Sequence, residues 1–540
     1  MLRRTIVLLG SLLLLLTLWQ CANPISPTGG PRDEQPPRID STRSTPNMQT
    51  NFRPQEIELT FDEWVKLEQA NQQVVISPPV QGYEVSLKGK TVTVDLGDED
   101  TLRTNVTYVI QFGEAVKDLT ESNPAEDLRF VFSTGPYIDS LELSGQVLDA
   151  YTAEPVPQTL VMLYDNLADT VFRTTKPFYF GRTNEEGQFR ISNLRPGQYK
   201  LTALEDADAN YRFNQVAERI AFQAEPITIS PDTSARISLR LFREELPLQV
   251  QEVDSSRWGL LKLTFNRPPT EELNLLTEET YLPTGRADSL ILWHQVASRW
   301  PLIITADTTL RDTLTVPAAP ASRATAQEAI ATFNIPGESP LKHSPAKPLR
   351  IGFSRPITAV DTSLVSLLQD TLPDRLPIRW EIDSTDQRIL SVRRGLKENA
   401  NYRLEFLPGA VTDYWGIAST DTLQRRWTTV DIKNFGNLQI RYTNADTSIQ
   451  YHIRLLVKGQ EPVATFNYEG QGSYSDEVKS LAPGDYQLEI IEDLNRNDRW
   501  DAGKYDTKRQ PERVFIRTLE TLRANWDLEV DVDLGTLFES

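Results

Sequence analysis

The chain has 540 residues, of which 39% are hydrophobic and 24% charged, and a formal net charge of −19. This length is more than one hydrophobic core supports, so we expect several domains. The acidic balance, without a cluster of Lys and Arg, argues against nucleic acid as a partner, and one cysteine excludes an intramolecular disulfide.

The first 20 residues have the pattern of a secretory signal peptide. Arg3 and Arg4 precede an apolar stretch from Thr5 to Gln20, which is short for a membrane-spanning helix of about 20 residues. The stretch ends at Leu18-Trp19-Gln20-Cys21, which resembles the lipobox of bacterial lipoproteins, although Gln20 stands where a small residue is usual. The resemblance implies that Cys21 is lipidated. The alternative is an uncleaved signal anchor with an incidental cysteine.

Residues 21–36 are rich in proline and glycine and are expected to form a semi-extended tether. Acyl chains on Cys21 contribute about 0.8 kcal/mol per buried methylene, so two or three chains make a stable anchor. The expected partner at this end is therefore a membrane. The segment Asn23–Asp33 resembles the start of Bacteroidota lipoproteins, and Ala22-Asn23-Pro24 lacks the early acidic run associated with surface export there. The resemblance implies the cell envelope, with the periplasmic face of the outer membrane favoured over the surface.

Residues 37–136, the predicted first module, contain short alternating apolar runs that indicate half-buried strands. A spacing of five such runs over about 80 residues favours an immunoglobulin-like sandwich. The runs are Ile57–Phe61, Val74–Ile76, Thr91–Asp95, Tyr108–Phe112 and Phe130–Phe132.

The same pattern recurs in residues 346–430, the predicted fourth module. Leu349–Phe353 parallels Ile57–Phe61, and Asn401–Phe406 followed by Gly409–Asp413 parallels Val106–Phe112 followed by Glu114–Asp118. These segments resemble the SbsA-type bacterial Ig-like domain. A third copy of the opening strand, Leu261–Phe265, makes residues 246–345, the predicted third module, a β-rich domain with Ig-like character.

A second repeat occupies residues 137–245 and, in a degraded copy, residues 431–540, the predicted second and fifth modules. The first copy includes Ser144–Asp149, Thr183–Ile191 and Leu194–Leu201, and the last is matched by Leu481–Leu488. These segments resemble the carboxypeptidase-regulatory or prealbumin-like module. The predicted fold class is therefore all-β, a tandem of Ig-like and prealbumin-like sandwiches.

Both copies of the second repeat run on into an acidic loop. In the last loop Asp493, Asn495, Asn497 and Asp501, with the Arg499 carbonyl, have the spacing of oxygen ligands in a calcium loop of the EF-hand kind. The corresponding set in the first loop is Asp206, Asp208, Asn210 and Asn214.

Two features argue against tight calcium binding. Asp498 and Tyr211 stand where such a loop needs glycine, and Lys504 and Ala217 stand where a bidentate Glu belongs. A structural calcium ion is one interpretation of the loops, and a turn held by Asp and Asn side chains is the other.

Other chemistry is less well supported. Tryptophans could form a sugar-stacking platform, but one tryptophan per sandwich is more often a core residue; the six considered are Trp64, Trp258, Trp293, Trp300, Trp415 and Trp500. The many carboxylates supply chance acid pairs, which are better interpreted as solvated surface. The sequence contains no Ser-His-Asp, P-loop or dinucleotide motif, which leaves no catalytic residue to name.

The leading interpretation is a non-catalytic lipoprotein of the cell envelope, a modular scaffold or stalk anchored through Cys21 that engages a protein partner. The first alternative is a carbohydrate-binding accessory lipoprotein, with a glycan as partner. The second is a hydrolase within residues 246–345.

Overall fold

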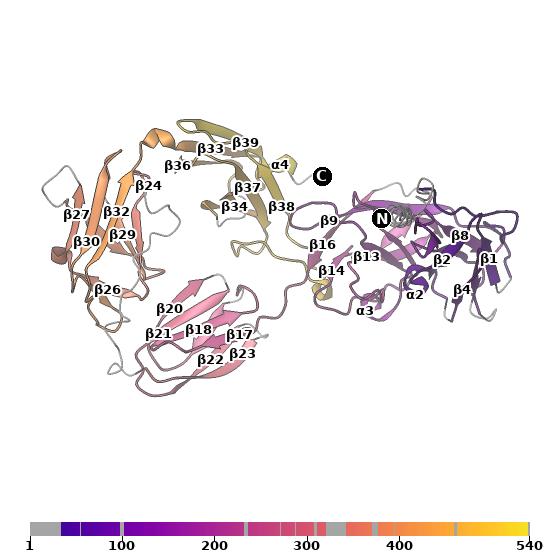
Figure 1. The fold of residues 1–540 in the computed structure, drawn as a ribbon, viewed down its shortest axis with the longest axis horizontal. Coiled ribbons are helices and arrows are strands. Elements are labelled where there is room, and N and C mark those ends of the chain that lie inside the picture. The colour runs from indigo at the N-terminus through magenta and orange to yellow at the C-terminus, as the bar shows by residue number, and fades with distance from the viewer. Residues whose placement is uncertain are drawn as a thin grey trace, which may run out of the picture.

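The computed structural model describes residues 34–537, apart from gaps at 54–55, 81, 98–101, 232–235, 270–271, 287, 307–309, 320–341, 370–375, 394 and 458–461. The predicted signal peptide, Cys21 and the tether as far as residue 33 lie outside the described residues. Figure 1 shows the described chain as a series of β-sandwiches, and the predicted all-β fold class is confirmed. Among the described residues, no helix has the length and apolar character needed to cross a bilayer.

The first module contains three small antiparallel sheets, with strand orders β1-β5-β4, β3-β6-β8 and β2-β7. Alternation places Val92 and Val94 of β5 in the core and leaves its threonines half-buried. The predicted run Thr91–Asp95 coincides with β5, and the other four runs differ from the observed strands by one residue at each end. The strands are β1 (Glu56–Thr60), β2 (Val65–Leu67), β3 (Val75–Ser77), β4 (Glu84–Lys88), β5 (Thr91–Asp95), β6 (Thr107–Gln111), β7 (Val116–Asp118) and β8 (Arg129–Ser133).

The fourth module repeats this plan, with strand orders β25-β29-β28, β24-β32-β30-β27 and β26-β31. Its first strand, β24, lies within the range assigned to the third module, yet it pairs in parallel with β32. The strands are β24 (Lys342–His343), β25 (Leu349–Gly352), β26 (Ile357–Val360), β27 (Val365–Gln369), β28 (Arg379–Ile382), β29 (Ile389–Arg393), β30 (Asn401–Phe406), β31 (Val411–Asp413) and β32 (Leu423–Thr429).

The second module is one curled sheet, in the order β11-β10-β13-β14-β16-β9-β12, with β15 paired to β13. Its first and last strands, β9 and β16, pair in parallel. The strands are β9 (Leu141–Asp149), β10 (Leu160–Tyr164), β11 (Tyr179–Arg182), β12 (Gln188–Leu194), β13 (Gly197–Leu204), β14 (Arg219–Phe222), β15 (Ile227–Ile229) and β16 (Ile237–Arg243).

The fifth module keeps most of these pairings but divides them between two sheets, β36-β33-β39 and β35-β34-β37-β38. Its first and last strands, β33 and β39, are again parallel. The two modules therefore share a strand plan as well as a sequence motif. The strands are β33 (Gly436–Thr443), β34 (Gln450–Val457), β35 (Ala464–Tyr468), β36 (Tyr474–Leu481), β37 (Tyr486–Asp493), β38 (Val514–Thr518) and β39 (Asp527–Asp533).

The third module has two sheets, β17-β18-β21-β20 and β19-β22-β23. The predicted opening strand is β18, but it lies inside its sheet between β17 and β21, whereas β1 and β25 are at sheet edges. The third module therefore differs in strand order from the first and fourth. The strands are β17 (Val250–Asp254), β18 (Leu260–Phe265), β19 (Leu273–Leu276), β20 (Tyr281–Arg286), β21 (Ser289–His294), β22 (Trp300–Ala306) and β23 (Leu310–Val316).

Among the described residues the helices are short, and all but the last, α4, lie in connections between strands. They are the α-helices α2 (Ala70–Gln73), α3 (Val171–Thr174) and α4 (Leu534–Leu537), and the 3-10 helices η4 (Thr362–Leu364), η5 (Ile432–Asn434) and η6 (Tyr505–Thr507).

Apolar packing also joins modules. One buried cluster includes residues of both the first and second modules, and a second joins Phe172 of the second module to Tyr505 of the fifth. A third places Trp415 of the fourth module against Trp293 of the third. The described chain therefore has three contacts between modules, one of which links modules that are distant in sequence.

Candidate cation sites in two acidic loops

The two acidic loops occupy the same place in their modules. The first, residues 205–218, connects β13 to β14, and the second, residues 494–513, connects β37 to β38. The strand before each loop carries a tyrosine whose hydroxyl donates to the carbonyl four residues earlier, Tyr199 to Arg195 at 3.1 Å and Tyr486 to Ala482 at 2.7 Å. The same local packing therefore positions both loops.

The leading aspartate of each loop, Asp206 or Asp493, accepts backbone hydrogen bonds from the residues four and five positions later. Asp206 accepts from the amides of Asn210 and Tyr211 at 3.2 and 2.8 Å. Asp493 accepts from the amides of Asn497 and Asp498 at 3.1 and 2.7 Å. The two aspartate side chains therefore hold the turns through backbone amides, as one interpretation of the loops expects.

The absence of glycine from the sixth position does not prevent the turn. Tyr211 has φ of 64° and Asp498 has φ of 61°, so both adopt the left-handed conformation that glycine would supply. The lack of glycine therefore does not rule out a calcium loop, because the backbone adopts the required conformation. A non-glycine residue in this conformation is strained.

A buried glutamate closes each loop, and the sequence analysis missed both. Glu218 accepts from the amides of Ala207 and Asn214 at 3.3 and 3.2 Å. Glu512 accepts from the corresponding amides, those of Leu494 and Asp501, at 2.7 and 3.0 Å. The exposed fractions of Glu218 and Glu512 are 2% and 4%. The second objection was the lack of a glutamate at the twelfth position of the loop. It assumed the fixed spacing of an EF-hand, whereas Glu218 and Glu512 reach their loops from later positions.

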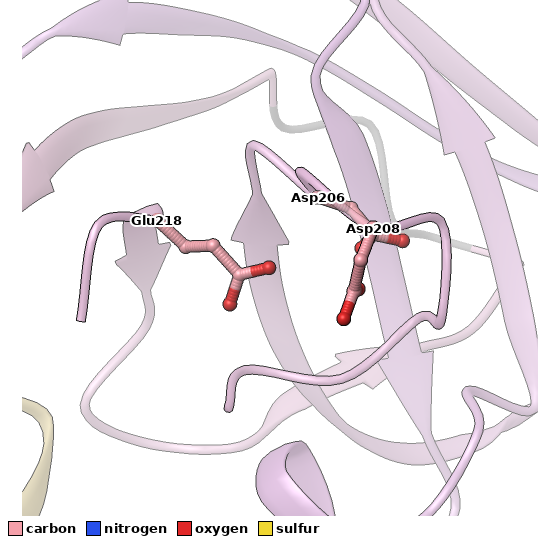
Figure 2. Close-up of side chains that lie close together, drawn as sticks. All are labelled: Asp206, Asp208 and Glu218. Carbon is pink, nitrogen blue, oxygen red and sulfur yellow. The ribbon is translucent and has the colours of Figure 1, made fainter. Parts of the chain in front are cut away.

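In the first loop the carboxylates converge. Asp206, Asp208 and Glu218 each offer an oxygen, and these oxygens lie within 4.8 Å of one another (Figure 2). Burial raises the pKa of Asp206, although the amides of Tyr211 and Asn210 oppose the shift. The pKa of Asp208 is lowered, because hydrogen bonds, first from Gln215, outweigh the effect of its partial desolvation.

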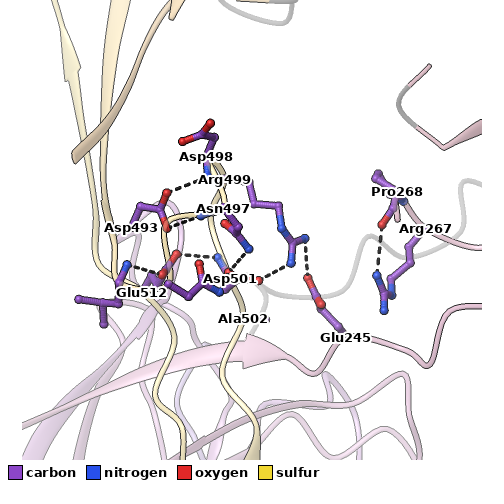
Figure 3. Close-up of polar contacts among 12 residues, drawn as sticks. Glu245, Arg267, Pro268, Asp493, Asn497, Asp498, Arg499, Asp501, Ala502 and Glu512 are labelled. Atoms are coloured by element: carbon purple, nitrogen blue, oxygen red, sulfur yellow. Dashed lines mark hydrogen bonds and ion pairs between the residues drawn. The ribbon is translucent and has the colours of Figure 1, made fainter. Parts of the chain in front are cut away.

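In the second loop the four predicted ligands are partly brought together, and Figure 3 shows three of them, Asp493, Asn497 and Asp501. The side-chain amides of Asn495 and Asn497 donate to Asp501 at 2.6 and 2.7 Å, while Asp493 faces the backbone. The Arg499 guanidinium also contacts Asp501, at 2.5 Å, and supplies positive charge where the prediction had only its carbonyl.

The electrostatics of the second loop are set by burial of several carboxylates. Asp493, Asp501 and Glu512 are 0%, 3% and 4% exposed. Burial, together with the nearby negative charges of Asp501 and Asp493, raises the pKa of Glu512 to about 7 despite its two backbone hydrogen bonds. Both loops thus concentrate hard oxygen atoms, the ligand type that calcium prefers. The calcium prediction stays a prediction.

The tryptophans are mainly core residues. Trp293, Trp300 and Trp415 are at most 9% exposed, whereas Trp64 is 59% exposed. Trp258, Trp293 and Trp415 pack against one another between the third and fourth modules, with ring centroids 5.0 and 5.8 Å from that of Trp415. The core interpretation is confirmed for these residues, and glycan binding stays a prediction.

The three histidines lie far apart in the fold and are buried. Burial lowers the pKa of His294 in β21. His343 contacts the Lys347 carbonyl at 3.1 Å, and His452 contacts the Asn467 side chain at 2.7 Å. The His294 ring lies against Trp300 of its own module, with centroids 5.5 Å apart, and its carbonyl accepts from Trp415 of the fourth module.

Comparison with known proteins gives one family. Residues 33–134 match the bacterial Ig-like domain. No curated protein matches the chain in sequence.

Several solved structures are similar at low identity. Domains 1–6 of surface layer protein SbsC have 11% identity and a TM-score of 0.15, covering 90% of this chain and 67% of that one. The Bacillus anthracis TIE protein has 9% identity and a TM-score of 0.14, covering 93% and 75%. The FN1–FN3 domains of chicken CNTN1 have 12% identity and a TM-score of 0.13, covering 50% and 97%. Residues 33–134 are therefore described as similar to the bacterial Ig-like domain, and the other modules by their own strands.

Proposed function

We propose that the protein is a non-catalytic, lipid-anchored scaffold of the cell envelope that holds a protein partner on its β-sandwich modules. The anchor is Cys21, and the periplasmic face of the outer membrane is the proposed location. The proposal is supported most by the role of the buried carboxylates, which bind backbone amides. Buried carboxylates such as Asp118, Glu218 and Glu512 accept backbone amides within their own module, so they hold loops in shape.

The exposed parts of the modules support a role in protein binding. Sheet edges and loops of sandwiches are the usual contact elements of such modules. Trp64 and Leu119 are exposed side by side at one end of the first module, where the Leu119 amide donates to the Trp64 carbonyl at 2.9 Å. Crosslinking in intact cells followed by mass spectrometry identifies the partner. Turnover of a substrate by the purified chain, abolished by one substitution, would contradict the proposal.

Replacing Cys21 with serine is expected to abolish membrane attachment, because the thiol that receives the acyl chains is gone. Labelling of cells with a fatty acid, followed by fractionation, measures the result. The parent chain should carry label and sediment with membranes, and Cys21→Ser should do neither. Ser26→Ala in the same segment is the control. Equal processing and sedimentation of Cys21→Ser and the parent would reject the anchor.

We also propose that a weakly bound calcium ion stabilises the acidic loops, favoured by the convergence of Asp206, Asp208 and Glu218. Calcium at about ten times its dissociation constant would add about 1.4 kcal/mol to the stability of the folded state. We therefore expect calcium, but not magnesium at the same concentration, to raise the melting temperatures of the second and fifth modules by a few degrees.

The variant Asp208→Asn should remove the part of this calcium effect that belongs to the first loop, and Asp501→Asn the part that belongs to the second. Glu225→Gln, an exposed residue outside both loops, is the matched control. An unchanged melting temperature at millimolar calcium would contradict calcium binding. The acidic residues would then serve only to hold the turns.

A further inference from the structure

The second and fifth modules are in contact although the third and fourth modules lie between them in sequence. The main contacting segment of the fifth module is residues 499–510, within its acidic loop, which we call the clasp; Glu489 of β37 also accepts from the Tyr151 hydroxyl at 2.5 Å. The clasp contains η6 and reaches the part of the second module formed by α3 and β14 (Figure 1). The residues that meet are more than 250 positions apart.

The centre of the contact is Tyr505, which is 4% exposed. Its ring lies edge-on to Phe172 and Phe222, with centroid distances of 5.1 and 5.3 Å. Its hydroxyl donates to the Asp169 carbonyl at 2.9 Å, so the polar end of the buried ring is also satisfied. A buried tyrosine of this kind is typical of the residues that dominate the energy of a protein interface.

Close backbone approach supports the same contact. A Cβ on Gly503 would lie 2.4 Å from the Cζ atom of Phe242 in the second module and 2.8 Å from the Arg509 carbonyl oxygen. The Gln510 side chain donates to the Phe222 carbonyl at 3.0 Å. The clasp therefore contacts the second module through Gly503 and again, seven residues later, through Gln510.

Ion pairs surround this apolar centre. Arg173 of α3 meets Asp506 at 2.8 Å, and Arg499 meets Glu245 at 3.3 Å. These pairs are partly exposed and contribute little energy individually, but they fix the orientation of the contact. The arrangement of a buried aromatic anchor inside a charged rim is that of a specific interface.

The clasp is an addition to the loop plan that the two modules share. Four positions separate Asn214 from Glu218 in the first loop, and eleven separate the corresponding residues, Asp501 and Glu512, in the second. The seven extra residues lie between two amino acids that hold the loop in shape, and they include Gly503 and Tyr505. The fifth module thus carries an insertion in which Tyr505 is buried against the second module, while most of the other side chains remain exposed.

The clasp also holds the connection from which the third module departs. The Tyr505 amide donates to Glu244 at 2.6 Å, and Arg499 pairs with Glu245, two residues that follow directly after β16. Only residues 246–249 then remain before β17 begins at Val250. The direction in which the third module leaves the second is therefore coupled to closure of the clasp.

We infer that the clasp holds the fifth module on the second in the intact protein. The second to fifth modules then form a closed loop, in which the joined third and fourth modules are attached at both ends. This arrangement differs from a linear stalk, in which successive modules add their lengths. Because both partners belong to one chain, their effective concentration is high, so one aromatic anchor with a charged rim is enough to keep the loop closed.

Chemical crosslinking tests closure directly. In the full chain carrying Cys21→Ser, Arg173→Cys and Asp506→Cys introduce the only two thiols, and a short bismaleimide is the probe. We expect a crosslink within one chain, at a rate that does not depend on protein concentration. The pair Arg173→Cys and Asp383→Cys, the second of which is in the fourth module, is the control and should not crosslink.

Two variants should open the clasp. Tyr505→Ala removes the anchor, and Gly503→Ala places a methyl group against Phe242. Each is expected to lower the crosslinking rate at least about tenfold and to increase the radius of gyration measured by X-ray scattering, because a buried aromatic contact is lost or displaced. Leu494→Ala, at a residue that is 65% exposed in the same loop, should change neither quantity.

Two results would overturn the inference. Crosslinks that join two chains and increase with concentration would show that the contact forms between copies. An unchanged crosslinking rate and radius of gyration in both Tyr505→Ala and Gly503→Ala would show that the clasp does not hold the loop closed. If one variant is found unfolded by circular dichroism, the other decides, since the two substitutions act on different atoms of the contact.

Discussion

Replacing Trp415 with alanine should separate the third and fourth modules and lower their stability by about 3–5 kcal/mol, the range for truncating a buried aromatic side chain. Trp415 is 9% exposed, and its indole nitrogen donates to the His294 carbonyl of the third module at 2.9 Å. Its ring packs on Trp258 and Trp293, and the Arg355 guanidinium lies 5.0 Å from its centroid. The substitution removes all of these contacts together.

The close fit at this junction makes relaxation around the cavity difficult. Gly259 has φ of 69°, and a Cβ there would lie 2.6 Å from the Cζ2 atom of Trp415, so the ring rests directly on the turn. Without the ring, that turn has no packing partner on the fourth module. Hydrogen exchange should therefore accelerate at Leu260 and Ile291, which belong to the same cluster.

Denaturant unfolding followed by circular dichroism measures the stability loss, and mass spectrometry locates the change in exchange. Trp64→Ala is the control, because that side chain is 59% exposed and its removal should change stability by about 0.5 kcal/mol or less. Unchanged exchange at Leu260 and Ile291 in Trp415→Ala would mean that the two modules are coupled elsewhere.

This junction shows which features of the fold can be predicted from sequence and which cannot. Alternation along single strands located β5 at its observed ends, because one buried face imposes a period of two. The same reasoning could assign Trp415 to a core but not to a core shared with Trp293, since contacts between modules leave no periodic signal. The order of strands in the third module was missed for a related reason. The motif of Leu261–Phe265 specifies a buried strand, and its neighbours are set by distant segments.

In the acidic loops, too, local features were predictable from sequence and contacts with later residues were not. Local spacing singled out Asp206 and Asp493 as calcium ligands or, alternatively, as residues that hold a turn; the structure shows the hydrogen bonds of the turn, and calcium binding stays a prediction. Local spacing missed Glu218 and Glu512, because the number of residues between the start of the loop and its glutamate differs between the two loops. Comparing the two copies could have revealed them, since each is the last acidic residue before the next strand. The clasp had no sequence signal beyond the extra residues around Tyr505.

Replacing Asp118 with alanine should lower the stability of the first module by about 3 kcal/mol, because several backbone donors lose a charged acceptor at once. Asp118 ends β7 and is 1% exposed. Four successive amides donate to its carboxylate, at distances from 2.5 to 2.9 Å; they belong to Thr120, Glu121, Ser122 and Asn123. The turn after β7 therefore depends on this one side chain.

Asparagine at the same position separates the role of the charge from that of shape. Three of the four amides donate to Oδ1, which Asp118→Asn can retain as a carbonyl oxygen, while the amide of Asn123 would face the new NH2 group. We expect a loss smaller than that of Asp118→Ala at neutral pH. Urea unfolding of both variants, compared with Asp127→Ala at an exposed position of the same module, measures these differences.

The pH dependence follows from the same contacts. Burial alone would raise the pKa of Asp118, but the amides of Asn123, Glu121, Ser122 and Thr120 together hold it below the ordinary value of 3.8. Between the folded and the ordinary pKa the unfolded chain binds more protons, so this stabilisation is complete above pH 3.8 and is lost as the pH falls through the folded pKa. The stability difference between the parent and Asp118→Asn should therefore shrink on acidification. A difference that stays constant from neutral pH to about pH 2 would mean that the carboxylate charge does not stabilise the turn.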